Sequence, residues 1–133
     1  LNDWLQAGSG IVGELDESET ELEFLKRIKK TFEVGCLRHN KLKGREIQRV
    51  ALCGGAGAFL LPQANRSGAD VFITGEIKYH DYFGHEEDIL MAEIGHYESE
   101  QYTKEIFYSI IRDLFPNFAL QLSKINTNPI KYL

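Results

Sequence analysis

Residues 47–57 read Ile47-Gln48-Arg49-Val50-Ala51-Leu52-Cys53-Gly54-Gly55-Ala56-Gly57, a nearly continuous apolar run that ends in a glycine cluster. Such a run is typical of a strand that is buried on both faces. Glycines placed directly after a strand are typical of a tight turn. Residues 58–65 then have a helical character, with Pro62 near the start. This stretch therefore predicts a strand–turn–helix unit, the building block of an α/β fold.

The same alternation continues on both sides of this unit. Besides residues 47–53, we predict strands within residues 8–15 and at residues 34–37, 69–73, 89–94 and 118–122. Helices are predicted at about residues 19–32, 58–65, 77–83 and 97–115, the first with a capping box formed by Ser18 and Glu21. Strands that alternate with helices predict the α/β class, here a mixed, mostly parallel sheet flanked by helices. No linker-like stretch divides the chain, so we expect one domain over residues 1–133.

Composition limits the functional classes. The chain has 133 residues, of which 43% are hydrophobic and 26% charged, as expected of a compact domain with a core. A net charge of −5 does not favour nucleic acid. No apolar stretch is long enough to span a membrane. Cys36 and Cys53 lie in short apolar runs, which predicts buried, reduced thiols and a cytoplasmic protein. The chain does not begin with Met, which suggests a piece of something longer.

Three loops follow predicted strands of this sheet. In open α/β sheets, ligands bind outside the carboxyl ends of the strands. These ends are followed here by residues 54–57, 74–81 and 95–100. We therefore expect the three loops to line one crevice.

The first loop is a candidate for anion binding. Backbone N–H groups at a strand-to-helix turn can hold an anion, and the candidate residues are Gly54, Gly55 and Gly57, with Thr74 from the second loop. The loop matches neither the phosphate-binding Walker pattern nor the dinucleotide fingerprint. Tight packing of strand against helix is the alternative, and short glycine motifs favour it.

The second loop is dense in side chains that can transfer protons. Glu76 or His80 could act as a general acid or base. The alternatives are a carboxylate favoured by a helix N-terminus for Glu76 and a surface hydrogen bond for His80. The sequence leaves both interpretations open.

The third loop contains a candidate pair of metal ligands. His96 and Glu100 are four residues apart, so on a helix they lie on the same face one turn apart. An imidazole with a carboxylate suits zinc, manganese or iron rather than calcium. Two ligands do not complete a site, and a helix-capping pair with a surface ion contact is the alternative.

Taken together, five segments resemble the C-terminal half of the Nif-three-like proteins, also called GTP cyclohydrolase type 2 homologues. The resemblance covers nearly the whole chain, and the order and spacing of the segments carry it. The segments are Gly8-Ser9-Gly10-Ile11-Val12-Gly13, Arg49-Val50-Ala51-Leu52-Cys53-Gly54-Gly55-Ala56-Gly57, Ala69-Asp70-Val71-Phe72-Ile73-Thr74-Gly75-Glu76, Gly95-His96-Tyr97-Glu98-Ser99-Glu100 and Asn126-Thr127-Asn128-Pro129-Ile130.

The resemblance implies a dinuclear metal centre for which His96 and Glu100 supply ligands. It also implies homo-oligomers, often toroidal hexamers. The family takes its other ligands from an adjacent His-His pair and a separate Asp in an N-terminal half, and none of the four histidines here is adjacent to another. The resemblance thus implies the C-terminal portion of a longer protein, with half of the metal site.

Three functional hypotheses follow. The first is a metal-dependent, GTP-cyclohydrolase-like hydrolase acting on a nucleotide. In it, two zinc, manganese or iron ions lower the pKa of a water that attacks the substrate, and Glu76 or His80 moves protons. The second is a metal-binding oligomeric scaffold or protein-interaction module without catalysis. The third is a folded segment that is inactive and binds little or no metal by itself.

Overall fold

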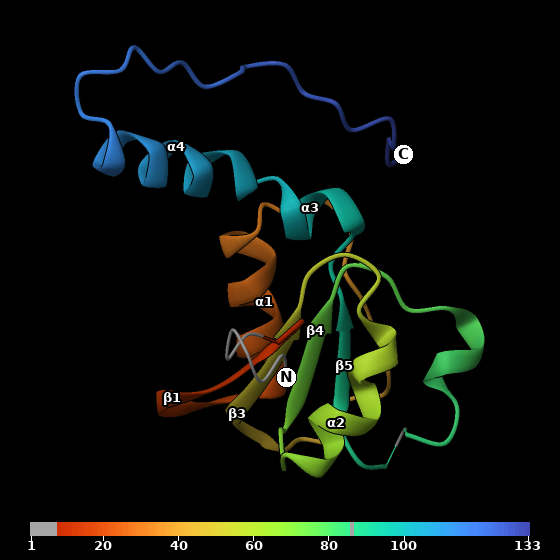
Figure 1. Cartoon of the computed structure of the whole chain (residues 1–133). Helices are drawn as coiled ribbons and strands as arrows, with labels where there is room; N and C mark the ends of the chain where they lie inside the picture. The colour runs from red at the N-terminus through yellow and green to blue at the C-terminus, as the bar shows by residue number, and fades with distance from the viewer. Residues whose placement is uncertain (1–7, 86) are drawn as a thin grey trace.

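A computed structural model describes residues 8–85 and 87–133 and contains a five-stranded sheet (Figure 1). The strands lie in the order β1-β3-β4-β5-β2. The three central strands run parallel, and each edge strand pairs antiparallel with its neighbour. The prediction of a mixed α/β sheet is confirmed. The strands are β1 (Ile11–Thr20), β2 (Arg38–His39), β3 (Glu46–Cys53), β4 (Val71–Thr74) and β5 (Leu90–Glu93).

The helices flank this sheet, with α1 and α2 on opposite faces (Figure 1). The predicted helix over 58–65 is present as a 3₁₀ turn followed by α2, and the one over 77–83 is the short 3₁₀ helix η2. In the described part of the chain, no helix combines the length and the apolar character needed to cross a membrane. The helices are α1 (Glu21–Thr31), η1 (Ala58–Leu60), α2 (Leu61–Arg66), η2 (Tyr79–Tyr82), α3 (His96–Glu100) and α4 (Thr103–Leu114).

Two apolar cores form because side chains alternate between the faces of a strand. In β4, Val71 and Ile73 pack on the α1 side with Phe24, whereas Phe72 packs on the α2 side with Leu61. Every residue of β4 is buried. This burial on both faces is what the apolar character of the central strands predicted.

The start of α1 lies two residues later than predicted. The N-cap is Thr20, because β1 continues to that residue, and Ser18 lies within the strand. The Thr20 hydroxyl accepts a hydrogen bond from the Glu23 N–H at 3.4 Å and donates one to the Glu23 carboxylate at 2.7 Å. The prediction that Ser18 and Glu21 form the capping box is therefore wrong, since strand pairing with β3 overrides the local motif.

The segment after α1 also differs from its prediction. No strand forms over residues 34–37, because the chain turns at Glu33, whose φ is +55°. Pairing with β5 begins only at Arg38. Cys36 is exposed, so the prediction that it is buried is wrong, whereas Cys53 is buried as predicted.

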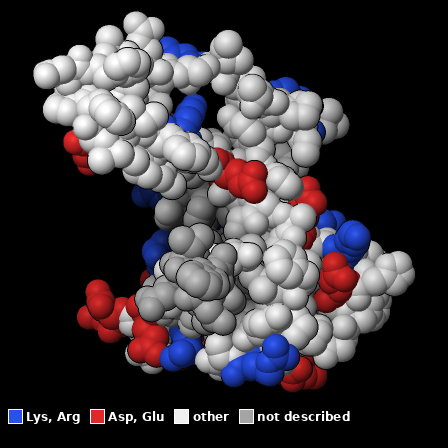
Figure 2. Space-filling model, in the orientation of Figure 1, with Lys and Arg blue, Asp and Glu red and all other residues white. Residues whose placement is uncertain are grey.

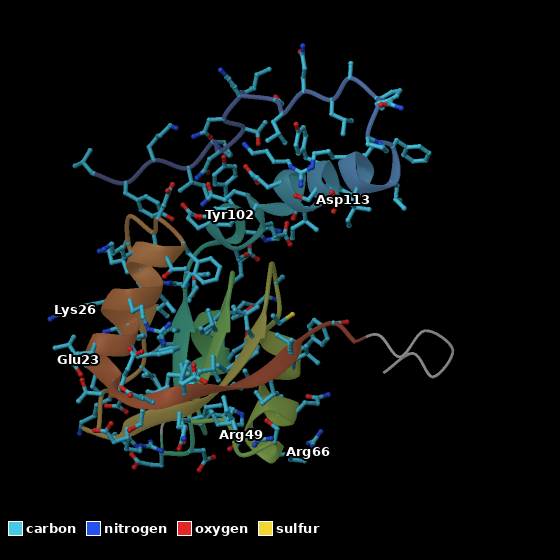
Figure 3. All side chains as sticks on the ribbon, turned by 90° about the vertical axis from the view of Figure 1, so that its left-hand side faces the viewer. Glu23, Lys26, Arg49, Arg66, Tyr102 and Asp113 are labelled. Atoms are coloured by element: carbon cyan, nitrogen blue, oxygen red, sulfur yellow. The ribbon has the colours of Figure 1, made fainter. Side chains whose placement is uncertain are left out.

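The long predicted helix over 97–115 is divided into α3 and α4. At the break, the Gln101 side chain donates to the Phe32 carbonyl at 3.2 Å and the Tyr102 hydroxyl donates to the Thr31 carbonyl at 3.3 Å. These bonds fix the α3–α4 junction on the end of α1, as the position of Tyr102 shows (Figure 3). The predicted strand over 118–122 is absent, since that segment follows α4 without a sheet edge to join.

An uncovered apolar face distinguishes α4 from the other long helix. None of its residues is buried, although the helix is strongly amphipathic. It projects from the body of the molecule (Figure 1), and the surface there is largely uncharged (Figure 2). We call this surface the α4 face; its exposed apolar residues are Ile106, Phe107, Ile110 and Leu114.

The observed cap predicts a difference between two hydroxyl residues. Thr20→Ala should lower the free energy of unfolding by about 1 kcal/mol, because it removes an N-cap. Ser18→Ala is the matched control and should change it by less than about 0.5 kcal/mol, since Ser18 is exposed in the strand. Urea unfolding followed by circular dichroism measures both, and equal losses would contradict the assignment of Thr20 as the cap.

The same cap predicts a pH dependence. Hydrogen bonds from Thr20 lower the pKa of Glu23. A lowered folded-state pKa adds stability that is present above the unfolded pKa and is lost as the pH falls through the folded one. The difference in stability between wild type and Thr20→Ala should therefore narrow on acidification below about pH 4.

Candidate functional site

The three predicted loops meet at the carboxyl edge of the central strands. β3, β4 and β5 are parallel, so the residues that follow Cys53, Thr74 and Glu93 emerge at the same edge. The second and third loops are joined by backbone hydrogen bonds, from Ile94 N–H to Thr74 at 3.0 Å and from Gly95 N–H to Gly75 at 3.1 Å.

Gly55 joins the first loop to the other two. Its carbonyl accepts hydrogen bonds from the Thr74 hydroxyl and from the Glu76 N–H, each at 3.1 Å. Its N–H donates to the Ser99 hydroxyl at 2.9 Å, and that hydroxyl in turn donates to the His96 carbonyl at 2.8 Å. The backbone groups of Gly55 thereby hold the loop that carries Glu76 against the helix that carries His96.

Two glycines allow the loops to approach this closely. Gly55 has φ +62°, and a Cβ there would collide with the Glu100 carboxylate. At Gly75 a Cβ would lie 2.6 Å from the Gly55 carbonyl oxygen, 2.7 Å from the Ser99 hydroxyl and 3.0 Å from the His96 Cα. Side chains at these positions would push the three loops apart.

His96 lies between two carboxylates. Its Nδ1 is 2.8 Å from a Glu76 oxygen, and its Nε2 is 3.4 Å from a Glu100 oxygen. All three side chains are about half exposed, so they face an accessible space. A negative charge at Glu100 also contributes to raising the pKa of the Cys53 thiol, although burial is the larger cause.

Within this cluster of three side chains, His96 Nε2 and Glu100 are the pair placed to face the same ion. The two ring nitrogens point to different sides of the imidazole, so Glu76 and Glu100 do not converge on one point. Within residues 8–85 and 87–133, no group of three or more His, Cys, Asp or Glu side chains is arranged to hold a metal ion. The imidazole and carboxylate donors suit a transition metal, and Gly55 leaves room beside the Glu100 carboxylate. The donor set thus fits one part of a larger metal site.

A pocket of about 310 Å³ adjoins this cluster. Glu76 belongs to both, since it lines the pocket and contacts His96. Lys78 adds a cationic side chain to a lining that also holds the carboxylates of Glu76 and Asp81, and Phe59 adds an exposed aromatic ring. No local sequence pattern marks Lys78 and Phe59, because the folded sheet is what brings them beside Glu76. The other lining residues are Ala56 and Ala58.

The anion-binding candidates have partners within the protein. Gly57 N–H lies 3.0 Å from the Thr74 hydroxyl, and Gly55 N–H is bonded to Ser99. Thr74 is buried, whereas Gly54 is exposed and packs near Ser99 and Glu100. The geometry of this loop is that of close packing between strand, turn and helix.

His80 contacts a neighbouring side chain of its own short helix. Its side chain is exposed on η2, and its ring meets the Tyr79 ring edge-on at 5.4 Å. Of the two candidates for proton transfer, Glu76 is the one that the structure brings to His96. Nothing in the local sequence distinguishes the two, because the contact depends on the β4–β5 register.

The C-terminal segment contacts the far side of α3. Glu98, which lies between the two candidate ligands in the sequence, is buried. The Asn128 side-chain amide donates a hydrogen bond to the Glu98 carboxylate at 3.4 Å. Tyr132 packs close to Gly35 and Gly95. This segment therefore supports the short helix that presents His96 and Glu100.

This fold and loop arrangement are those of a known family. Residues 3–129 match the family model Duf34/NIF3 (NGG1p interacting factor 3). The chain belongs to this family, as the resemblance of its five segments predicted.

Individual relatives agree with the family assignment. A Staphylococcus epidermidis protein named GTP cyclohydrolase 1 type 2 homolog is 34% identical over 99% of this chain, which spans 37% of that protein. Its Staphylococcus aureus counterpart is 33% identical over 95% of the chain, which spans 36% of it. The chain therefore spans little more than a third of the length of these curated relatives.

Solved structures show the same fold. This chain superposes on the crystal structure of Staphylococcus aureus protein SA1388 with a TM-score of 0.81 and 30% sequence identity. The aligned region covers 93% of this chain and 42% of the SA1388 chain. A Bacillus cereus protein related to NIF3 gives a TM-score of 0.78 at 25% identity, over 95% of this chain and 36% of that one.

The close approach of the loops predicts that Gly75→Ala is damaging. The new methyl group would displace the Gly55 carbonyl and His96, so the free energy of unfolding should fall by about 1–3 kcal/mol. Gly13→Ala is the matched control, because a Cβ at Gly13 meets nothing within 4 Å. Urea unfolding measures both changes, and a neutral Gly75→Ala would show that the loops are not tightly packed.

Proposed function

We propose that this chain supplies His96 and Glu100 to a dinuclear metal site in a GTP-cyclohydrolase-like hydrolase that acts on a nucleotide. The observation that carries the proposal is the pairing of His96 Nε2 with a Glu100 oxygen at 3.4 Å, beside a pocket. When Nδ1–H donates to Glu76, a neutral His96 ring has its lone pair on Nε2, which faces the Glu100 carboxylate. A cation held between Nε2 and the Glu100 oxygen would satisfy both acceptors.

Zinc, manganese or iron suits this donor pair. When bound, such an ion supplies a Lewis acid and lowers the pKa of water. His96 and Glu100 hold it from one helical face, and Glu76 keeps the ring in place. The remaining ligands come from the part of the longer protein that this chain does not span. Alone, the chain holds such an ion weakly and is inactive.

The pocket offers complementary groups for a nucleotide. The exposed Phe59 ring can stack on a planar base. Lys78 can bind an anionic group as a point charge, which suits it better for this role than Gly55 and Gly57, whose N–H groups have internal partners. Thr74 then acts by holding the glycine loop. Glu76 lines the pocket and can accept or return a proton there, whereas His80 is not among the residues that line it.

A non-catalytic role is the second candidate. The α4 face is uncovered in the described residues, and large exposed apolar patches mark association sites. In this alternative the protein is a metal-binding scaffold whose subunits form a ring, with the α4 face against a neighbouring subunit. The metal then stabilises the assembly and takes no part in turnover.

The catalytic proposal is tested with His96→Ala in the full-length protein. Metal content by elemental analysis should fall, and nucleotide hydrolysis should decrease by about 100-fold or more, the scale set by loss of one stabilising group at a reacting centre. His39→Ala is the matched control, because His39 is exposed on β2 and bonded to the neighbouring Asn40 carbonyl. Unchanged turnover in His96→Ala would rule out the catalytic role.

The scaffold alternative makes a different prediction. Ile110→Lys places a charge on the α4 face and should reduce the oligomer size measured by light scattering. Ser109→Lys, at the adjacent exposed position, should leave it unchanged. Loss of turnover in Glu100→Ala with unchanged assembly would favour the enzyme, whereas no effect of Ile110→Lys would contradict association through this face.

A further inference from the structure

We propose that Glu76 is a positioning residue that holds neutral His96 in the Nδ1–H tautomer, which leaves the unprotonated Nε2 on the side of Glu100. The consequence for metal binding rests on the proposed function above. The choice of tautomer does not, because it follows from a contact within this chain.

The contact itself assigns the direction of the hydrogen bond. A carboxylate can only accept, so at 2.8 Å the Nδ1–H of His96 donates to Glu76. A neutral imidazole then carries no proton on Nε2, which is the nitrogen that lies 3.4 Å from Glu100. A hydrogen bond at one ring nitrogen is the usual device that selects the tautomer and exposes the other nitrogen as a ligand.

The backbones on both sides of this hydrogen bond are fixed. Glu76 N–H donates to the Gly55 carbonyl at 3.1 Å, directly after the buried strand β4. The His96 carbonyl accepts from the Ser99 hydroxyl, which is also bonded to Gly55. With both backbones fixed, the remaining freedom is rotation of a ring that is about half exposed. Without Glu76, a proton on Nδ1 would lose its acceptor, whereas a proton on Nε2 would face the Glu100 carboxylate 3.4 Å away.

Positioning is chemically separable from proton transfer. In Glu76→Gln, the amide oxygen still accepts from Nδ1–H, but the side chain no longer takes up a proton at neutral pH. Glu76→Ala removes both abilities. The two variants therefore distinguish an orienting hydrogen bond from a general base at the same position.

The test uses the 133-residue chain labelled with ¹⁵N-histidine, without added metal, at a pH where His96 is neutral. NMR of the ring nitrogens should show His96 with its proton on Nδ1 in wild type and in Glu76→Gln. In Glu76→Ala the proton should move toward Nε2. Asp81→Asn is the matched control, because Asp81 lines the same pocket but bonds to the Lys78 N–H; it should retain the wild-type tautomer.

The outcomes are decisive in either direction. The same His96 tautomer in wild type and Glu76→Ala, with a native-like amide spectrum, would overturn the proposal, as would a wild type with the proton on Nε2. If Glu76→Ala does not fold, Glu76→Gln and the wild-type spectrum still decide it, because loss of the Nδ1–H tautomer in a folded Gln variant contradicts the orienting hydrogen bond.

Zinc titration of the same variants in the full-length protein separates this inference from the proposed function. Glu76→Ala should weaken Zn²⁺ binding by about 10–100-fold, as expected for loss of a group that orients a ligand, and Glu76→Gln should weaken it less. A tautomer change in a full-length protein that binds none of zinc, manganese and iron would leave the positioning role intact and refute the metal site.

Discussion

The backbone of Gly55, through its N–H and its carbonyl, is the constraint on which the arrangement of the site depends. Its carbonyl accepts from Thr74 and Glu76, and its N–H donates to Ser99, so it contacts both other loops. These groups lie where the carboxyl ends of parallel strands meet, a place at which backbone groups no longer have ladder partners. The polar groups released there satisfy one another, and the result is a rigid frame around His96.

The central part of the fold could be predicted because local and tertiary preferences agree there. The apolar run from Ile47 to Cys53 forms most of β3, whose buried residues belong to both cores. At the start of α1 and at Cys36, local sequence patterns and tertiary contacts favour different structures. Ser18 satisfies the capping motif as well as Thr20 does, and only pairing of β1 with β3 decides between them. Cys36 has an apolar neighbourhood in sequence, but the turn at Glu33 takes it away from the sheet.

The candidate site was predictable in part for the same reason. Helical spacing places His96 and Glu100 on one face whatever surrounds them, because only local geometry is involved. The contact between Glu76 and His96 spans twenty residues and depends on the register of neighbouring strands. Lys78 and Phe59 join the pocket through the same register and the η1 turn. The break at Tyr102 was beyond prediction, since it is fixed by carbonyls at the end of α1.

Both edges of the sheet are poorly suited to growth by strand addition. One edge is β1, where acidic side chains include Glu14, Asp16 and Glu17 and the register with β3 shifts between Glu14 and Glu19. The other is β2, only two residues long. Charged, irregular or very short edge strands resist pairing with further strands. Growth of this sheet by amyloid-like stacking of further strands is thereby disfavoured at both edges.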